Sequence, residues 1–145
     1  MKPPTRNPKL IGEWVECEFM ARAARAGLTI SKPYGDSAPF DFIVGRKTPL
    51  HRVQVRGTSG WVKRSYVCRL THGFPPVRYD QSDFDFLAAY VIPCRQWYVI
   101  PLDAMANVQS AISLYPHVEE SAGRFEKYRD AWKLLHDRPN GTAIG

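Results

Sequence analysis

The chain has 145 residues, a formal net charge of +6 at pH 7 and three cysteines. A chain of this length fits one domain that can bury a core without disulfides or a structural metal. No run of about 18 apolar residues is present to span a bilayer, and the start of the chain lacks the apolar segment of a secretory signal. We therefore expect a cytoplasmic protein with no membrane partner. The three cysteines lie far apart inside apolar runs, so we expect reduced core residues rather than metal ligands: Cys17, Cys68 and Cys94.

The first part of the chain predicts one helix followed by several strands. The helix is expected from Leu10 to Ala26, where apolar residues recur every four positions in a proline-free segment that stops at Gly27. Apolar runs bounded by turn residues then predict strands at Leu28–Ile30, at Phe40–Val44 and, with strict alternation, at His51–Arg56. After a turn at 57–60, the next strand is expected at Ser65–Leu70.

The second part of the chain predicts a hairpin and a closing helix. Residues 71–82 read as irregular, and two apolar runs after them predict paired strands at Phe84–Ile92 and Trp97–Ile100. A short helix is expected at Pro101–Met105, and apolar residues at helical spacing predict a second amphipathic helix at Arg124–His136. The expected fold class is α/β, a mixed central sheet flanked by helices, over residues 10–137. Residues 1–9 are expected to form a flexible arm and residues 138–145 a flexible tail.

The positive charge is concentrated in one stretch of the chain. From Phe42 to Tyr79 there are eight Lys and Arg residues and no Asp or Glu, which suits a polyanionic partner such as DNA. The expected nucleic-acid contacts are four of these cations and an aromatic residue in a glycine-flanked turn: Arg52, Lys63, Arg64, Arg69 and Trp61. A solvated basic face, with Trp61 at its rim or in a subunit contact, is the alternative.

Several polar residues in apolar surroundings could carry chemistry. Asp41 lies inside an apolar strand, where a carboxylate is costly unless it is paired or binds a metal. Gln54 and Arg56 alternate with valines, so they point to the same side of their strand. Glu16 lies beside the apolar stripe of the predicted helix, with Glu13 as the alternative one turn earlier. Taken singly, each residue also fits a structural role.

Together, these residues resemble the PD-(D/E)XK nucleases, whose pattern is a helix glutamate, an aspartate opening a strand, and an acid-x-lysine on the next strand. The resemblance runs through Gly12-x-x-x-Glu16, Pro33-Tyr34-Gly35-Asp36, Phe40-Asp41 and Val53-Gln54-Val55-Arg56-Gly57-Thr58. It is greatest to the bacterial branch related to intron-encoded homing endonucleases and Holliday junction resolvases, some of which carry glutamine at the acid position. Later segments, Asp83–Tyr90 and Trp97–Pro101, extend the likeness over residues 11–101.

The resemblance implies a restriction-endonuclease-like core and an endonuclease that hydrolyses DNA, including structured or branched sites, with Mg²⁺ or Mn²⁺ as cofactor. It implies Asp41 as principal metal ligand, Glu16 as a ligand or neighbouring acid, and Gln54 as a neutral ligand through its amide oxygen. Arg56 takes the usual lysine position and completes the catalytic set. Related enzymes often cut both strands as dimers, which implies a homo-oligomer.

Two residues depart from the family's pattern. Gln54 supplies no negative charge, and Arg56 cannot carry a proton because its guanidinium is permanently protonated. The alternative function is therefore a catalytically inactive nucleic-acid-binding module on the same fold. Lys63 is a candidate for the missing amine if its strand lies alongside the site.

Overall fold

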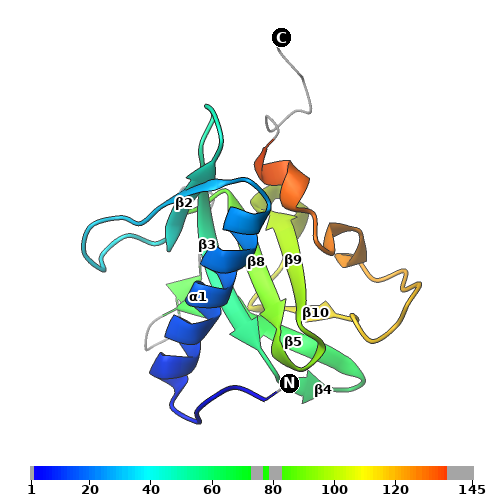
Figure 1. The fold of residues 1–145 in the computed structure, drawn as a ribbon. Coiled ribbons are helices and arrows are strands. Elements are labelled where there is room, and N and C mark those ends of the chain that lie inside the picture. Colours follow the sequence, from blue (N-terminus) through cyan, green and yellow to red (C-terminus); the bar gives the residue numbers. More distant parts are fainter. Residues whose placement is uncertain (1, 73–76, 79–82, 137–145) are drawn as a thin grey trace.

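The computed structural model describes residues 2–72, 77–78 and 83–136 (Figure 1). The helix predicted near the start of the chain is present as α1 (Pro8–Arg25). It begins two residues earlier than expected because Asn7 caps it, its side chain accepting a hydrogen bond from the Lys9 amide at 3.0 Å, while Pro8 occupies the first turn, where no amide donor is needed. The helix ends at Arg25, and Gly27, two residues later, has a φ of 81°, the left-handed conformation that glycine tolerates best.

The central sheet has five strands in the order β1-β2-β3-β8-β9. Their bounds are β1 (Thr29–Ser31), β2 (Phe42–Gly45), β3 (His51–Thr58), β8 (Phe86–Val91) and β9 (Gln96–Pro101). Strands β3 and β8 run parallel and the other pairs are antiparallel, so the sheet is mixed, as predicted. Each predicted strand of this sheet is present, with ends shifted by one or two residues.

A second sheet packs behind the first and was only partly predicted. It has the order β10-β5-β4, with β4 (Trp61–Val62), β5 (Ser65–Arg69) and β10 (Ala111–Leu114). Strand β5 was predicted, but β4 and β10 were not, because two and four residues are too few for a clear periodic signal. The segment expected to be irregular includes two short strands that pair with each other, β6 (Thr71–His72) and β7 (Val77–Arg78). The predicted tail at 138–145 lies outside the described residues.

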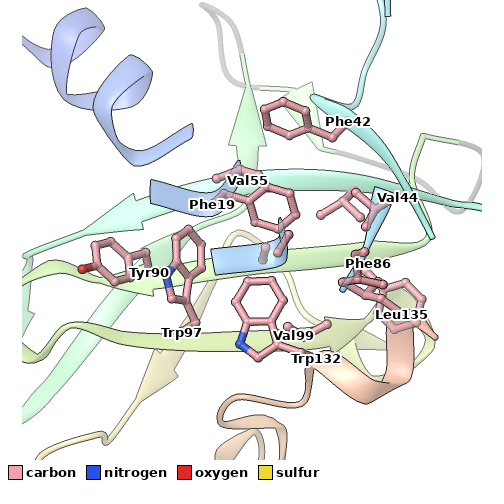
Figure 2. Packing of buried hydrophobic residues seen from close by; sticks show 14 of the residues in the cluster. Phe19, Phe42, Val44, Val55, Phe86, Tyr90, Trp97, Val99, Trp132 and Leu135 are labelled. Atoms are coloured by element: carbon pink, nitrogen blue, oxygen red, sulfur yellow. The ribbon is translucent and has the colours of Figure 1, made fainter. Parts of the chain in front are cut away.

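The core lies on both faces of the central sheet. On the α1 face, Phe19 stacks on Phe42 with ring centroids 5.2 Å apart and contacts Trp97 and Trp132 at 5.7 Å each (Figure 2). On the other face, side chains of β8 and β9 pack against the second sheet. Of the three free cysteines, Cys68 is buried here, whereas Cys17 is exposed on α1, so the expectation of a core position was wrong for Cys17. No helix in the described ranges has the length and apolarity needed to cross a membrane.

The predicted second helix at Arg124–His136 is wrong. The structure has two short 3-10 segments there, η3 (Glu126–Tyr128) and η4 (Trp132–Leu135). A third, η2 (Leu102–Met105), lies where a short helix was expected, and a fourth, η1 (Ile92–Cys94), was not predicted. Asp130, with φ of 47°, interrupts the helical path, and its amide donates to the Trp97 carbonyl of β9 at 2.9 Å. The apolar spacing was real, since Phe125, Trp132 and Leu135 are buried, but tertiary contacts replaced the helix.

Candidate active site

A cavity of about 400 Å³ lies between the first half of α1 and the carboxyl-terminal part of β3. Its lining includes all four residues of the predicted catalytic set: Glu16, Asp41, Gln54 and Arg56. Glu13, the alternative to Glu16, does not line it. The cavity is therefore lined by residues from α1, from the segment before β2 and from β3, which are separated by up to 40 positions in the sequence.

Asp41 is held against β3 by backbone hydrogen bonds. Its amide donates to the Val53 carbonyl at 2.9 Å, and its Oδ2 accepts from the Val55 amide at 2.7 Å. Burial raises the pKa of this carboxyl, and the nearby charge of Glu16 raises it further, although the Val55 amide and the cations of Arg56 and Lys32 act in the opposite direction. Burial disfavours the ionised form of this carboxyl, and a bound cation would offset that cost, so Asp41 is suited to be a metal ligand.

Gln54 and Arg56 lie on the sheet face opposite to the valines, as their alternation predicted. Val53 and Val55 belong to the core under α1, whereas Gln54 and Arg56 pair in register with Leu87 and Ala89 of β8. Gln54 is only 7% exposed, so its side chain is almost fully enclosed by neighbouring residues. On that face the burial of Cys68 raises its thiol pKa to about 12, with the charge of Arg56 opposing the shift.

Glu16 reaches the site because α1 and β3 approach closely. A Cβ added to Gly57 would lie 2.7 Å from Cγ2 of Val15, so only glycine permits this distance between helix and strand. Glu16 Oε1 accepts a hydrogen bond from Lys32 Nζ at 2.8 Å, in an ion pair that spans 16 positions of the sequence. Hydrogen bonding to Glu16 is the main cause that raises the pKa of Lys32, against a smaller effect of desolvation.

Lys32 does not line the cavity but forms an ion pair with Glu16, which does, and it was not predicted from the sequence. It directly follows β1 and is not part of the family's sequence pattern. Only the pairing of β1 with β2 brings it near Glu16 and Asp41. Lys63, which was considered for the missing amine, does not line the cavity and lies instead at the tip of the β4–β5 hairpin.

The oxygen ligands available in this cavity fit a hard divalent cation. Glu16 and Asp41 offer carboxylates and Gln54 offers an amide oxygen, the donor types that Mg²⁺ and Mn²⁺ accept. Within residues 2–72, 77–78 and 83–136 no group of three or more His, Cys, Asp and Glu side chains could hold a metal ion. A metal at this site would therefore depend on two carboxylates and Gln54, with water or phosphate oxygens completing its shell.

The predicted nucleic-acid contacts divide between a hairpin and other positions. Lys63 and Arg64 form the two-residue turn between β4 and β5, with φ of 48° and 65°. Trp61 is 52% exposed and contacts the rings of Tyr66 and His117, with centroids 4.9 and 4.8 Å away. Arg69 is exposed on β5. The remaining residue, Arg52, forms an ion pair with Asp85, with Nη2 and Oδ1 3.1 Å apart, so its charge is already compensated.

This hairpin is fixed to the end of the strand that carries Gln54 and Arg56. Thr58, the last residue of β3, donates its hydroxyl to the Val67 carbonyl at 2.6 Å and accepts from the Gly60 amide at 3.2 Å. Gly60 in turn accepts from the Val67 amide at 2.9 Å. Figure 1 shows the hairpin continuing from the end of β3, so its two cations lie beyond the strand end that lines the cavity.

Comparison with known proteins identifies the family and the fold. A family model described as PD-(D/E)XK endonuclease matches residues 6–135. Among solved structures, the chain is similar to the bacterial homing endonuclease I-Ssp6803I, with a TM-score of 0.75 and 29% sequence identity over 90% of this chain and 92% of that chain. A search of curated proteins gave no match. The resemblance and the fold class expected from the sequence are thus confirmed. Since the family model covers most of its length, the chain belongs to the PD-(D/E)XK endonuclease family.

Proposed function

We propose that the protein is a cytoplasmic endonuclease that hydrolyses DNA phosphodiester bonds with Mg²⁺ or Mn²⁺ as cofactor, including those at structured or branched sites. The observation that carries the proposal is the gathering of Glu16, Asp41, Gln54 and Arg56 around one cavity. Related enzymes often cut both strands of a duplex as dimers, so the proposal includes a homodimer.

The side chains would divide the chemistry as follows. Glu16, Asp41 and Gln54 would hold the divalent cation, which when bound polarises the scissile phosphate and activates an attacking water. The Val55 amide holds one Asp41 oxygen in position, so little reorganisation of this carboxylate is needed on binding. Arg56 would stabilise charge that develops on the phosphate, but it would not carry a proton because it stays protonated.

A cleavage assay with divalent cations tests the proposed function. Supercoiled and branched DNA should be cut only when Mg²⁺ or Mn²⁺ is present, and Mn²⁺ should support faster cutting because it accepts mixed carboxylate and amide ligands more readily. Arg56→Lys should raise the rate, since a compact ammonium can approach the attacking water more closely than a planar guanidinium can. Gel mobility of the DNA products gives both rates.

The same assay distinguishes the alternative function. If neither the natural chain nor Arg56→Lys cuts any DNA form with either metal, while both still bind DNA, the protein is a non-catalytic DNA-binding module. If neither protein binds DNA at low salt, the proposal of a DNA partner is wrong as well.

The hairpin tip provides a test of the DNA interface. Two-residue turns of this kind favour Asn-Gly, and each non-glycine residue with positive φ costs about 1 kcal/mol. The chain instead has Lys63 and Arg64 there, which favours a role for their charges. Lys63→Asn with Arg64→Gly should preserve or stabilise the turn, yet weaken DNA binding and lower the slope of log affinity against log salt by about 2.

A matched pair of substitutions controls for the change in net charge. Lys127 and Lys133 are also exposed, but lie on the η3–η4 segment. Replacing both by Ala should leave the salt dependence of DNA binding nearly unchanged. Equal effects of the two double variants, measured by fluorescence anisotropy with a labelled duplex, would show that the hairpin is not the DNA interface.

A further inference from the structure

Lys32 places a second cation beside the carboxylates of the site. Its Nζ lies 2.8 Å from Glu16 Oε1 and 4.9 Å from the centroid of the Phe42 ring. It also interacts electrostatically with Asp41, the residue before Phe42. The Lys32 ammonium therefore pairs with one of the two carboxylates that are proposed to hold the divalent cation and lies within electrostatic range of the other.

This position suits a charge that can be exchanged. Two neighbouring carboxylates repel each other, and Lys32 offsets that repulsion while no divalent cation is present. The Lys32 side chain is 61% exposed and that of Glu16 is 26% exposed, so the pair can separate without opening the core. An ion pair as exposed as this contributes little to stability, and the binding of a divalent cation by two carboxylates readily exceeds that contribution.

We infer that Lys32 is an exchangeable counter-ion of the active site, which Glu16 holds in the metal-free protein and gives up when a divalent cation binds. The inference rests on the proposed function, because it takes Glu16 and Asp41 as metal ligands. It makes Lys32 a competitor of the metal. The natural chain accordingly binds the cation less tightly than its ligand set would allow.

Isothermal titration of the full chain with Mn²⁺ tests this competition without measuring cleavage. Lys32→Met keeps an unbranched apolar side chain against Phe42 but removes the charge, so Mn²⁺ should bind about fivefold more tightly. Lys32→Arg keeps the charge and should stay close to the natural affinity. Asp41→Asn should remove the Mn²⁺ binding, which identifies the site that is being titrated.

The outcomes separate this inference from the function on which it rests. Tighter binding by Lys32→Met alone supports the exchange. Unchanged or weaker binding by Lys32→Met, with Asp41→Asn still abolishing it, overturns the role of Lys32 and leaves the metal site intact. If the natural chain binds no Mn²⁺ at all, both the proposed metal site and the inference fail. Thermal unfolding of each variant confirms that the titrated protein is folded.

Discussion

Asp41→Asn is expected to abolish DNA cleavage and at the same time to make the protein more stable. The asparagine oxygen can still accept the hydrogen bond from the Val55 amide, so the local structure is retained. The charge that would bind the divalent cation is lost, and cutting should fall about a thousandfold or more. The gain in stability follows from the burial that raises the pKa of Asp41, because the ionised form is disfavoured in the folded protein.

The pH dependence of this stability difference has a definite sign. The pKa of Asp41 is higher in the folded protein than its ordinary value of 3.8, so protonation of Asp41 stabilises the fold at a pH below 3.8. This stabilisation is lost as the pH rises through the raised pKa. The midpoint of thermal unfolding of Asp41→Asn should therefore exceed that of the natural chain more at pH 7 than near pH 4. Excess Mn²⁺ should raise the midpoint for the natural chain only. A variant that still cuts with the same metal dependence would show that Asp41 is not a ligand.

The site could be predicted from the sequence where its signals are local. Asp41 stands out because a charge interrupts an apolar run of the sequence, and the alternation around Gln54 and Arg56 fixes the side to which they point. The family pattern then joined them to Glu16. Lys32 could not be predicted in this way, because its contact with Glu16 depends on the pairing of β1 with β2 and on the position of α1.

The fold was predictable to a similar extent and for a similar reason. Helix α1 has its own cap and periodicity, so its limits are encoded within the segment itself. The segment Arg124–His136 is different, since its aromatic spacing fits a helix but its backbone is held by residues distant in the sequence. Arg129 forms a β-bridge with Tyr98, and the Asp130 amide bonds to the Trp97 carbonyl. Such contacts between β9 and the segment Arg124–His136 cannot be predicted from a short window of the sequence.

Glu126→Ala is expected to cause the largest loss of stability among the substitutions considered. Glu126 is 7% exposed and Tyr98 is fully buried, and their side chains are joined by a hydrogen bond of 2.7 Å. The same carboxylate accepts from Arg129 Nε at 2.9 Å and Nη2 at 2.6 Å, and from the Tyr115 amide at 3.1 Å. Alanine would leave a buried hydroxyl and a partly buried cation without this acceptor. The free energy of unfolding should fall by about 3–5 kcal/mol.

Two further variants show whether this loss comes from the network. Glu120 is exposed, so Glu120→Ala should change the free energy of unfolding by no more than about 0.5 kcal/mol. Tyr98→Phe removes one hydrogen bond and retains the ring, and should cost about 1 kcal/mol. Arg129 also donates to the Tyr115 and Val118 carbonyls at 2.7 Å each. If urea unfolding shows a loss below about 1 kcal/mol for Glu126→Ala, those carbonyl bonds are sufficient to hold the end of the chain on β9, and the carboxylate is not the centre of the network.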